Sequence, residues 1–173
     1  MGDMTDRRDA AETTAPRQAK VLTVSDGVSA GTREDLSGPA IVGHLGANGF
    51  EVVEHRVCPD GTEPVALALA NMAYRFSGLI VTTGGTGFGP RDRTPEGTRR
   101  VLDRRAAGLS EAMRLVSPLG RLSRGISGTR GETLILNVAG SPTGAIEMLD
   151  AVLDIIPHAL DLMLERPTSH PAA

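Results

Sequence analysis

The stretch 78–100 constrains the fold more than any other part of the chain. Its apolar residues Leu79–Val81 lead into a glycine-rich segment, which predicts a buried strand followed by a tight turn. A helix is expected next, with Thr94 as its N-cap, Pro95 at its first position and Glu96 near its positive end. A strand, a glycine turn and a helix N-terminus in this order are typical of phosphate-binding sites.

The turn itself has the composition of a ligand site. Its glycines allow positive φ and leave backbone N–H groups open to an anion; they are Gly84, Gly85, Gly87 and Gly89. Asp92 lies at the rim, where a carboxylate would repel a bare phosphate but could hold Mg²⁺. GGTG alone would indicate an ordinary turn, whereas the added glycines, acid and helix start favour a site.

Composition narrows the class of protein. A chain of 173 residues with 40% hydrophobic residues can form one domain with a substantial core. A net charge of −3 and 2% aromatic residues disfavour nucleic-acid binding. Cys58 is the single cysteine, so neither a disulfide framework nor a cysteine metal site is expected, as fits a cytoplasmic location.

The two ends of the chain are expected to lie outside the domain. Residues 1–19 contain no apolar run, which predicts a disordered tail rather than a secretory signal or a membrane span. A single domain is expected over 20–164, followed by a C-terminal tail over 165–173.

Several enzyme classes lack their motifs. Lys20 is the sole lysine among 18 basic residues and stands far from the glycine turn, which excludes a Walker A loop. The turn also lacks the spacing of a dinucleotide fingerprint, and no G-x-S-x-G elbow is present. The histidines share no metal-ligand spacing, so structural or solvent roles are expected for His44, His55, His158 and His170.

Strand and helix patterns alternate along the chain, and several strands are apolar on both faces. This favours an α/β fold, a three-layer αβα sandwich with a mostly parallel central sheet. The expected strands are Lys20–Val24, Phe50–Val57, Leu79–Val81 and Thr133–Val138, with Arg121–Arg130 as an edge strand or hairpin arm. The expected helices are Gly38–Asn48, one capped by Thr62, Gly97–Arg105, Leu109–Val116, Pro142–Ile156 and Pro157–Leu164.

Ligands of such sheets bind beyond the carboxyl ends of the strands. Asp60 and Asp92 follow two different strands there, and paired carboxylates beside an anion site suggest Mg²⁺ bridging phosphate oxygens. Asp60 also fits a simple Pro-Asp-Gly turn. Candidate phosphate ligands are Arg91, Arg93 and Arg124, and the hydroxyls of Ser25 and Ser141 could bind a ligand or cap a helix.

A set of motifs spread over residues 20–164 resembles one known family. They are Ser25-Asp26, Gly31, Asp35, Ser37-Gly38, Pro59-Asp60, Thr82–Gly87, Arg91–Glu96, Ser123-Arg124 and Leu136–Pro142. With them the chain resembles the molybdopterin-binding domain family, particularly the molybdopterin adenylyltransferases of molybdenum-cofactor biosynthesis. The combination of TTGGTG with the following D-x-TPE is highly specific, although Ala139 stands where the family more often has proline.

The resemblance implies a homotrimer that transfers AMP from ATP to the terminal phosphate of molybdopterin with the help of Mg²⁺, and transient contact with other molybdenum-cofactor enzymes. Asp60 and Asp92 match the acids that the family uses for this step, and they would hold the metal. The implied substrate- and nucleotide-binding residues are Ser25, Asp26, Thr83, Gly84, Gly85, Thr86, Gly87, Arg91, Thr94, Pro95, Glu96, Ser123, Arg124, Gly140, Ser141 and Pro142.

Two other functions stay open. A non-catalytic molybdopterin carrier or scaffold could share the fold, but that branch often lacks the Pro-Asp turn and replaces Thr94, and both are present here. A nucleotide pyrophosphatase is a more remote alternative, since related domains are fused to such activities.

Overall fold

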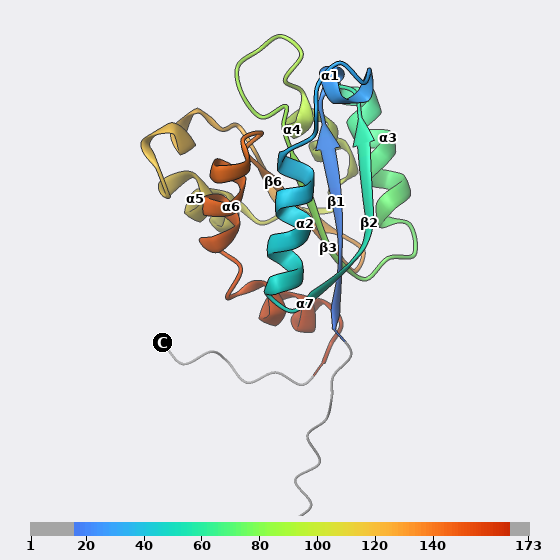
Figure 1. The fold of residues 1–173 in the computed structure, drawn as a ribbon. Coiled ribbons are helices and arrows are strands. Elements are labelled where there is room, and N and C mark those ends of the chain that lie inside the picture. The colour runs from blue at the N-terminus through green and yellow to red at the C-terminus, as the bar shows by residue number, and fades with distance from the viewer. Residues whose placement is uncertain (1–15, 167–173) are drawn as a thin grey trace, which may run out of the picture.

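The computed structural model describes residues 16–166. Its centre is a six-stranded sheet with the order β2-β1-β3-β6-β5-β4 (Figure 1). The strands are β1 (Arg17–Val24), β2 (Phe50–Cys58), β3 (Gly78–Thr83), β4 (Arg104–Arg105), β5 (Ser127–Arg130) and β6 (Thr133–Val138). β1 pairs in parallel with β2 and β3, and β3 pairs in parallel with β6, whereas β5 runs antiparallel to β6 and to β4. The expected mostly parallel sheet is confirmed.

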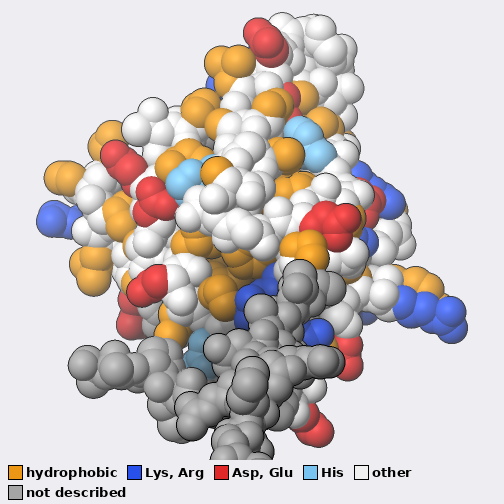
Figure 2. Space-filling model, turned by 60° about the horizontal axis from the view of Figure 1, so that its bottom comes forward, with side chains coloured by type: hydrophobic (Ala, Val, Ile, Leu, Met, Phe, Trp, Pro, Cys, Tyr) orange, Lys and Arg blue, Asp and Glu red, His pale blue; other side chains and the backbone are white. Residues whose placement is uncertain are grey.

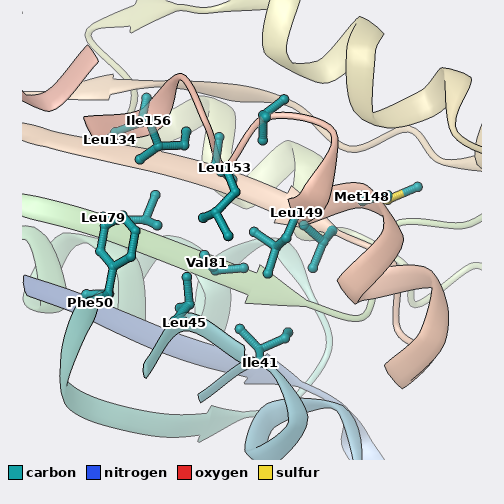
Figure 3. Packing of buried hydrophobic residues seen from close by; sticks show 14 of the residues in the cluster. Ile41, Leu45, Phe50, Leu79, Val81, Leu134, Met148, Leu149, Leu153 and Ile156 are labelled. Carbon is teal, nitrogen blue, oxygen red and sulfur yellow. The ribbon is translucent and has the colours of Figure 1, made fainter. Parts of the chain in front are cut away.

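Helices cover both faces of this sheet. They are α1 (Asp26–Ser29), α2 (Ser37–Ala47), α3 (Thr62–Ala73), α4 (Thr94–Val101), α5 (Ala107–Leu115), the 3-10 helix η1 (Pro118–Leu122), α6 (Pro142–Asp150) and α7 (Ile156–Met163). One buried cluster joins the sheet to α2, α5, α6 and α7 (Figure 3), and a second joins it to α3 and α4. The three-layer architecture is therefore confirmed.

The central strands are apolar on both faces because each contributes to both clusters. In β3, Leu79 and Val81 belong to the first cluster and Ile80 to the second; in β6, Leu134 and Leu136 alternate with Ile135 in the same way. Side chains of a strand alternate between the two faces, so this pattern requires helices on both sides.

Several predicted boundaries were wrong. α3 is preceded by Gly61 as N-cap, and Thr62 is already inside the helix. The predicted helix Gly97–Arg105 is α4, which begins earlier and ends at Val101, because Asp103 N donates to Thr129 O and starts the pairing of β4 with β5. The predicted helix Pro142–Ile156 divides into α6 and the start of α7, and β1 begins at Arg17 rather than Lys20.

Three further features say little about function: the lengths of the helices, the lower surface and the two ends of the chain. Within residues 16–166 no helix has the length and apolarity needed to cross a membrane. On the lower face, apolar, acidic and basic side chains are interspersed wherever described atoms are visible (Figure 2). The expected tails lie mostly outside the described residues, at 1–15 and 167–173.

Candidate active site

The loops that carry the candidate residues leave the same edge of the sheet. In the register of the parallel strands, Val24 lies beside Cys58, Thr23 beside Thr83, and Thr83 beside Val138. The loops after β1, β2, β3 and β6 therefore emerge together, at the top of the molecule in Figure 1. This is the edge where parallel sheets bind ligands.

Two glycines shape the turn after β3. Gly84 has φ 96° and Gly85 has φ 64°, conformations that glycine adopts without a steric penalty. A Cβ on Gly84 would lie 2.3 Å from Val24 O, and one on Gly85 would lie 2.3 Å from Thr94 Oγ1. The turn thus fits closely against β1 and α4.

The other two glycines serve a different purpose from the one expected. Gly87 and Gly89 do not have positive φ. Instead, a Cβ on either would lie 2.9 Å from Asp92 Oδ2, and that oxygen accepts a hydrogen bond from Gly89 N at 2.9 Å. These glycines make room for the carboxylate of Asp92.

Thr94 is not the N-cap of α4. Arg93 occupies that position without a side-chain cap, and Thr94 is the first helical residue. The buried Thr94 hydroxyl donates to Gly84 O at 2.8 Å, and Thr94 N donates to Gly85 O at 3.0 Å. Thr94 therefore ties the glycine turn to the helix start, and Pro95 is the second residue of the helix rather than the first.

Asp60 and Asp92 line the same cavity, although they are far apart in the sequence. This cavity, the smaller of two that meet at the site, has a volume of about 290 Å³ and is also lined by Ser25, Thr83 and Gly84. Asp60 Oδ2 accepts a hydrogen bond from Asp26 N at 2.8 Å, while its Oδ1 lies 3.1 Å from the position of a Cβ on Gly85. Both carboxylates are thus held beside the glycine turn.

Arg91 is engaged by an acid rather than free for phosphate. Its Nε and Nη2 donate to the two carboxylate oxygens of Asp26, each at 3.0 Å, and Nη2 also donates to Asp60 O at 2.7 Å. The hydrogen bond from Arg91 lowers the pKa of Asp26 from its ordinary value. Because Asp60 N also donates to Asp26 Oδ1 at 3.0 Å, these contacts join three of the loops.

Arg124 also stabilises the glycine turn, by hydrogen bonds to its backbone and to Glu96. Its Nε donates to Gly87 O at 2.7 Å, its Nη2 to Asp92 O at 2.5 Å and its Nη1 to Glu96 Oε1 at 2.5 Å. Arg124 N also donates to Thr86 O at 2.8 Å. All three guanidinium nitrogens are used by the protein, so the geometry gives Arg124 a positioning role.

Glu96 should make stability depend on pH. Burial raises its pKa, but the hydrogen bond and charge of Arg124 outweigh burial, and the pKa falls below its ordinary 4.5. The carboxylate therefore contributes stability above pH 4.5 that is lost as pH falls through the lowered pKa. We expect Glu96→Gln to lower the free energy of unfolding at neutral pH by at most about 1 kcal/mol. In urea denaturation this difference should vanish in acid; a difference independent of pH would contradict the assignment.

A larger cavity adjoins the smaller one. Its volume is about 510 Å³, and the two share Gly85, Asp92, Gly140 and Ser141. Thr86, Gly87 and Ser123 also line it. Sequence reasoning missed its remaining wall, which consists of Val116, Ser117, Leu119, Gly120 and Leu122 around η1 and of Thr143, Gly144, Glu147 and Met148 on α6.

The predicted site residues fall into two groups. Those that line one or both cavities are Ser25, Asp60, Thr83, Gly84, Gly85, Thr86, Gly87, Asp92, Ser123, Gly140, Ser141 and Pro142. Those that line neither are Asp26, Arg91, Thr94, Pro95, Glu96 and Arg124. Ser25 and Ser141 also cap helices, since their Oγ atoms accept from Val28 N and Gly144 N. Most residues of the second group stabilise, by hydrogen bonds, the loops that carry the residues of the first group.

Cys58 lies next to this edge but does not act as a nucleophile. Burial, with a smaller contribution from the negative charge of Asp60, raises the pKa of its thiol to about 12. A thiol with such a pKa is protonated at neutral pH and unreactive. Cys58 is thus a buried free cysteine.

Known proteins are similar in sequence to most of this chain. Gephyrin of Dictyostelium discoideum is 39% identical over 164 residues, which cover 86% of this chain but only 23% of gephyrin. A protein of Helicobacter pylori strain J99 named molybdopterin adenylyltransferase is 38% identical over 151 residues, covering 83% of this chain and 86% of that protein.

A solved structure has the same fold. The molybdopterin biosynthesis enzyme MoaB of Thermus thermophilus aligns with a TM-score of 0.83 and 47% identity, over 88% of this chain and 99% of that one. Residues 20–158 match the family described as "Probable molybdopterin binding domain". The chain therefore belongs to the molybdopterin-binding domain family.

Proposed function

We propose that this protein transfers AMP from ATP to the terminal phosphate of molybdopterin and releases pyrophosphate. The observation that carries the proposal is the pair of cavities that meet at Gly85, Asp92, Gly140 and Ser141, because adenylyl transfer needs two substrates whose phosphates come together. Relatives of 36–38% identity named molybdopterin adenylyltransferase support it.

The chemistry requires little covalent participation by the protein. An oxygen of the molybdopterin phosphate forms a bond to the α-phosphorus of ATP, and the bond from that phosphorus to the α,β-bridging oxygen breaks. Pyrophosphate leaves with the electron pair. The attacking group is already an anion, so the main difficulty is the repulsion between two polyanions at close range. Backbone N–H groups of the glycine turn and the start of α6, which line the cavities, would reduce it.

The acids of the smaller cavity fit a magnesium site that the substrate completes. Among the described residues no group of three or more His, Cys, Asp or Glu side chains could hold a metal alone. Mg²⁺ is commonly bound by one or two carboxylates together with substrate phosphates, and Asp60 and Asp92 would supply these carboxylates. The ion would neutralise charge on the phosphates.

The direct test is to incubate the protein with molybdopterin, ATP and Mg²⁺ and to measure adenylylated molybdopterin and pyrophosphate in equal amounts. Absence of product from protein that still binds molybdopterin would contradict the proposal. A carrier or scaffold would bind molybdopterin but not ATP in calorimetry. A pyrophosphatase would release nucleotide monophosphate without any pterin.

We further infer that copies of the chain associate through a leucine surface on α5 and η1. This surface consists of Leu115, Leu119 and Leu122, which are 80%, 76% and 55% exposed. Contiguous exposed apolar residues mark interaction sites in soluble proteins. Charges of both signs adjoin the surface at Glu111 and Arg121, so around a three-fold axis each copy can set its acid against the arginine of the next copy. We propose a homotrimer, located in the cytoplasm and in transient contact with other molybdenum-cofactor enzymes.

The double substitution Leu119→Glu and Leu122→Glu should separate the copies, because burying two carboxylates in an apolar interface is unfavourable. Native mass spectrometry should show trimers of the unchanged protein and monomers of this variant. Leu67→Glu is the matched control, since Leu67 is 65% exposed on α3 at another surface. Monomers of the unchanged protein, or trimers of the double variant, would contradict the assignment.

A further inference from the structure

Three polar side chains meet beneath the wall of the smaller cavity. They come from β1, β2 and the loop before α2. Thr23 Oγ1 donates to Asp35 Oδ2 at 2.6 Å, and His55 Nε2 lies 3.0 Å from Thr23 Oγ1 and 3.2 Å from Asp35 Oδ2. Thr23 and Asp35 also line the cavity, whereas His55 does not. From the sequence alone, only a structural or solvent role was expected for His55.

The number of available protons determines the role of His55. A threonine hydroxyl has one proton, and the hydroxyl of Thr23 gives it to Asp35. A carboxylate has no proton to give, so the hydrogen bonds of His55 Nε2 require Nε2 to be the donor. The imidazole therefore donates to both partners and fixes the Asp35 carboxylate from the side of β2.

The Asp35 carboxylate in turn fixes the start of α2. Its Oδ1 accepts from Gly38 N at 2.9 Å, in the manner of a helix cap. A Cβ on Gly38 would lie 2.3 Å from His55 Nε2 and 2.5 Å from both Asp35 Oδ2 and Thr23 Oγ1, so the helix backbone rests directly on the cluster. In the described part of the chain, Asp35 is the only one of residues 33–37 whose side chain forms a hydrogen bond to another segment.

The segment fixed in this way is a wall of the candidate site. Residues 33–37 all line the smaller cavity, together with Asp60, Asp92 and the glycine turn. Apart from the cluster, this wall is tied to another segment by Arg33 N, which donates to Gly27 O of α1 at 3.1 Å.

We propose that His55 is a positioning residue for ligand binding: through Asp35 and Thr23 it holds the wall 33–37 in the shape that the substrate requires. The proposal rests on the proposed function, because the ligand is whichever substrate of adenylyl transfer occupies the smaller cavity. His55 lines neither cavity, so its effect should be on affinity rather than on the chemical step.

The test compares His55→Leu with His55→Gln. The glutamine amide nitrogen can reach the place of Nε2 and donate, whereas leucine cannot. In His55→Leu the KM and the calorimetric Kd should rise about tenfold for one of the two substrates, molybdopterin or MgATP, as when an orienting partner is removed. The other substrate and kcat should change less than about threefold, and His55→Gln should restore most of the affinity.

His44→Leu is the matched control. His44 Nε2 also lies against an acid, Asp150 Oδ1 at 2.6 Å, and it projects from α2 itself, but it does not line either cavity. This variant should bind both substrates as the unchanged protein does. Equal binding by His55→Leu and the unchanged protein, equal losses in His55→Leu and His44→Leu, or no restoration by glutamine would each overturn the proposal.

Hydrogen exchange separates this proposal from the proposed function. Amides 33–38 should exchange faster in His55→Leu than in the unchanged protein or His44→Leu, and this requires no substrate. Unchanged exchange would overturn the role of His55 even in an active enzyme. Faster exchange in a protein that makes no adenylylated molybdopterin would overturn the proposed function and leave the positioning role standing.

Discussion

Asp92→Asn is expected to lower the rate of adenylyl transfer by about 10²- to 10³-fold, the usual loss when one preorganised electrostatic group is removed. The asparagine oxygen can still accept from Gly89 N, so the glycine turn should keep its shape. What disappears is the negative charge that would help to hold Mg²⁺ between the two cavities. Molybdopterin affinity, measured by calorimetry, should fall only modestly.

Asp103→Asn provides the control for this substitution. Asp103 Oδ2 accepts from the backbone N–H of Gly131 at 2.7 Å, as Asp92 accepts from a glycine N–H, but Asp103 lies outside both cavities. Its turnover should match that of the unchanged protein. If Asp92→Asn retains full activity, Asp92 does not belong to the catalytic group.

Gly84→Ala should cause the largest loss of stability among substitutions in the turn. The residue has φ 96°, and a Cβ would lie 2.3 Å from the backbone oxygen of Val24, which cannot move without displacing β1. We expect the free energy of unfolding to fall by about 2 kcal/mol or more, since strain and a backbone clash combine. Urea denaturation should show a lower midpoint, and the surviving folded protein should be inactive.

Gly49→Ala measures the strain of a positive φ without the steric clash that a Cβ causes at Gly84. Gly49 has φ 84°, but a Cβ there would meet nothing within 4 Å. This variant should lose only about 1 kcal/mol and keep its activity. Equal losses in the two variants would show that the close fit of Gly84 against β1 contributes nothing.

Most of the sheet could be predicted from hydrophobic runs. Leu79–Val81 and Leu134–Leu136 are continuous apolar segments, and such segments indicate strands buried on both faces. The division between α6 and α7 could not be predicted, because Val152, Leu153 and Ile156 continue the apolar spacing of a helix through the turn. In that turn Val152 N and Ile155 N donate to residues three positions earlier, which sequence periodicity does not reveal.

The role of Thr94 shows where local rules fail. A threonine before proline and glutamate is a good N-cap by its sequence, but the hydroxyl finds a better-placed partner in Gly84 O. This acceptor comes from a turn whose path depends on glycines with positive φ. Capping rules consider only neighbours along the chain, so they cannot anticipate it.

The acids of the site could be predicted, but their surroundings could not. Two carboxylates after parallel strands suffice to expect Asp60 and Asp92 at one edge of the sheet. The arginines depend instead on the conformations of the loops, which bring Arg91 to Asp26 and Arg124 to carbonyls of the glycine turn. The outer wall of the larger cavity could not be predicted, because Leu119 and Leu122 are exposed and lie in a segment that Pro118 and Gly120 interrupt.

The central claim is that Asp60 and Asp92 hold one divalent ion together with the substrate phosphates. Electron paramagnetic resonance of Mn²⁺, added with a non-hydrolysable ATP analogue, tests it most directly against the spectrum of the free Mn²⁺–nucleotide complex. The unchanged protein should show a protein-bound ion that depends on the nucleotide, and the variant with both Asp60→Asn and Asp92→Asn should show only the free complex. The same bound-ion spectrum from both proteins would contradict the claim.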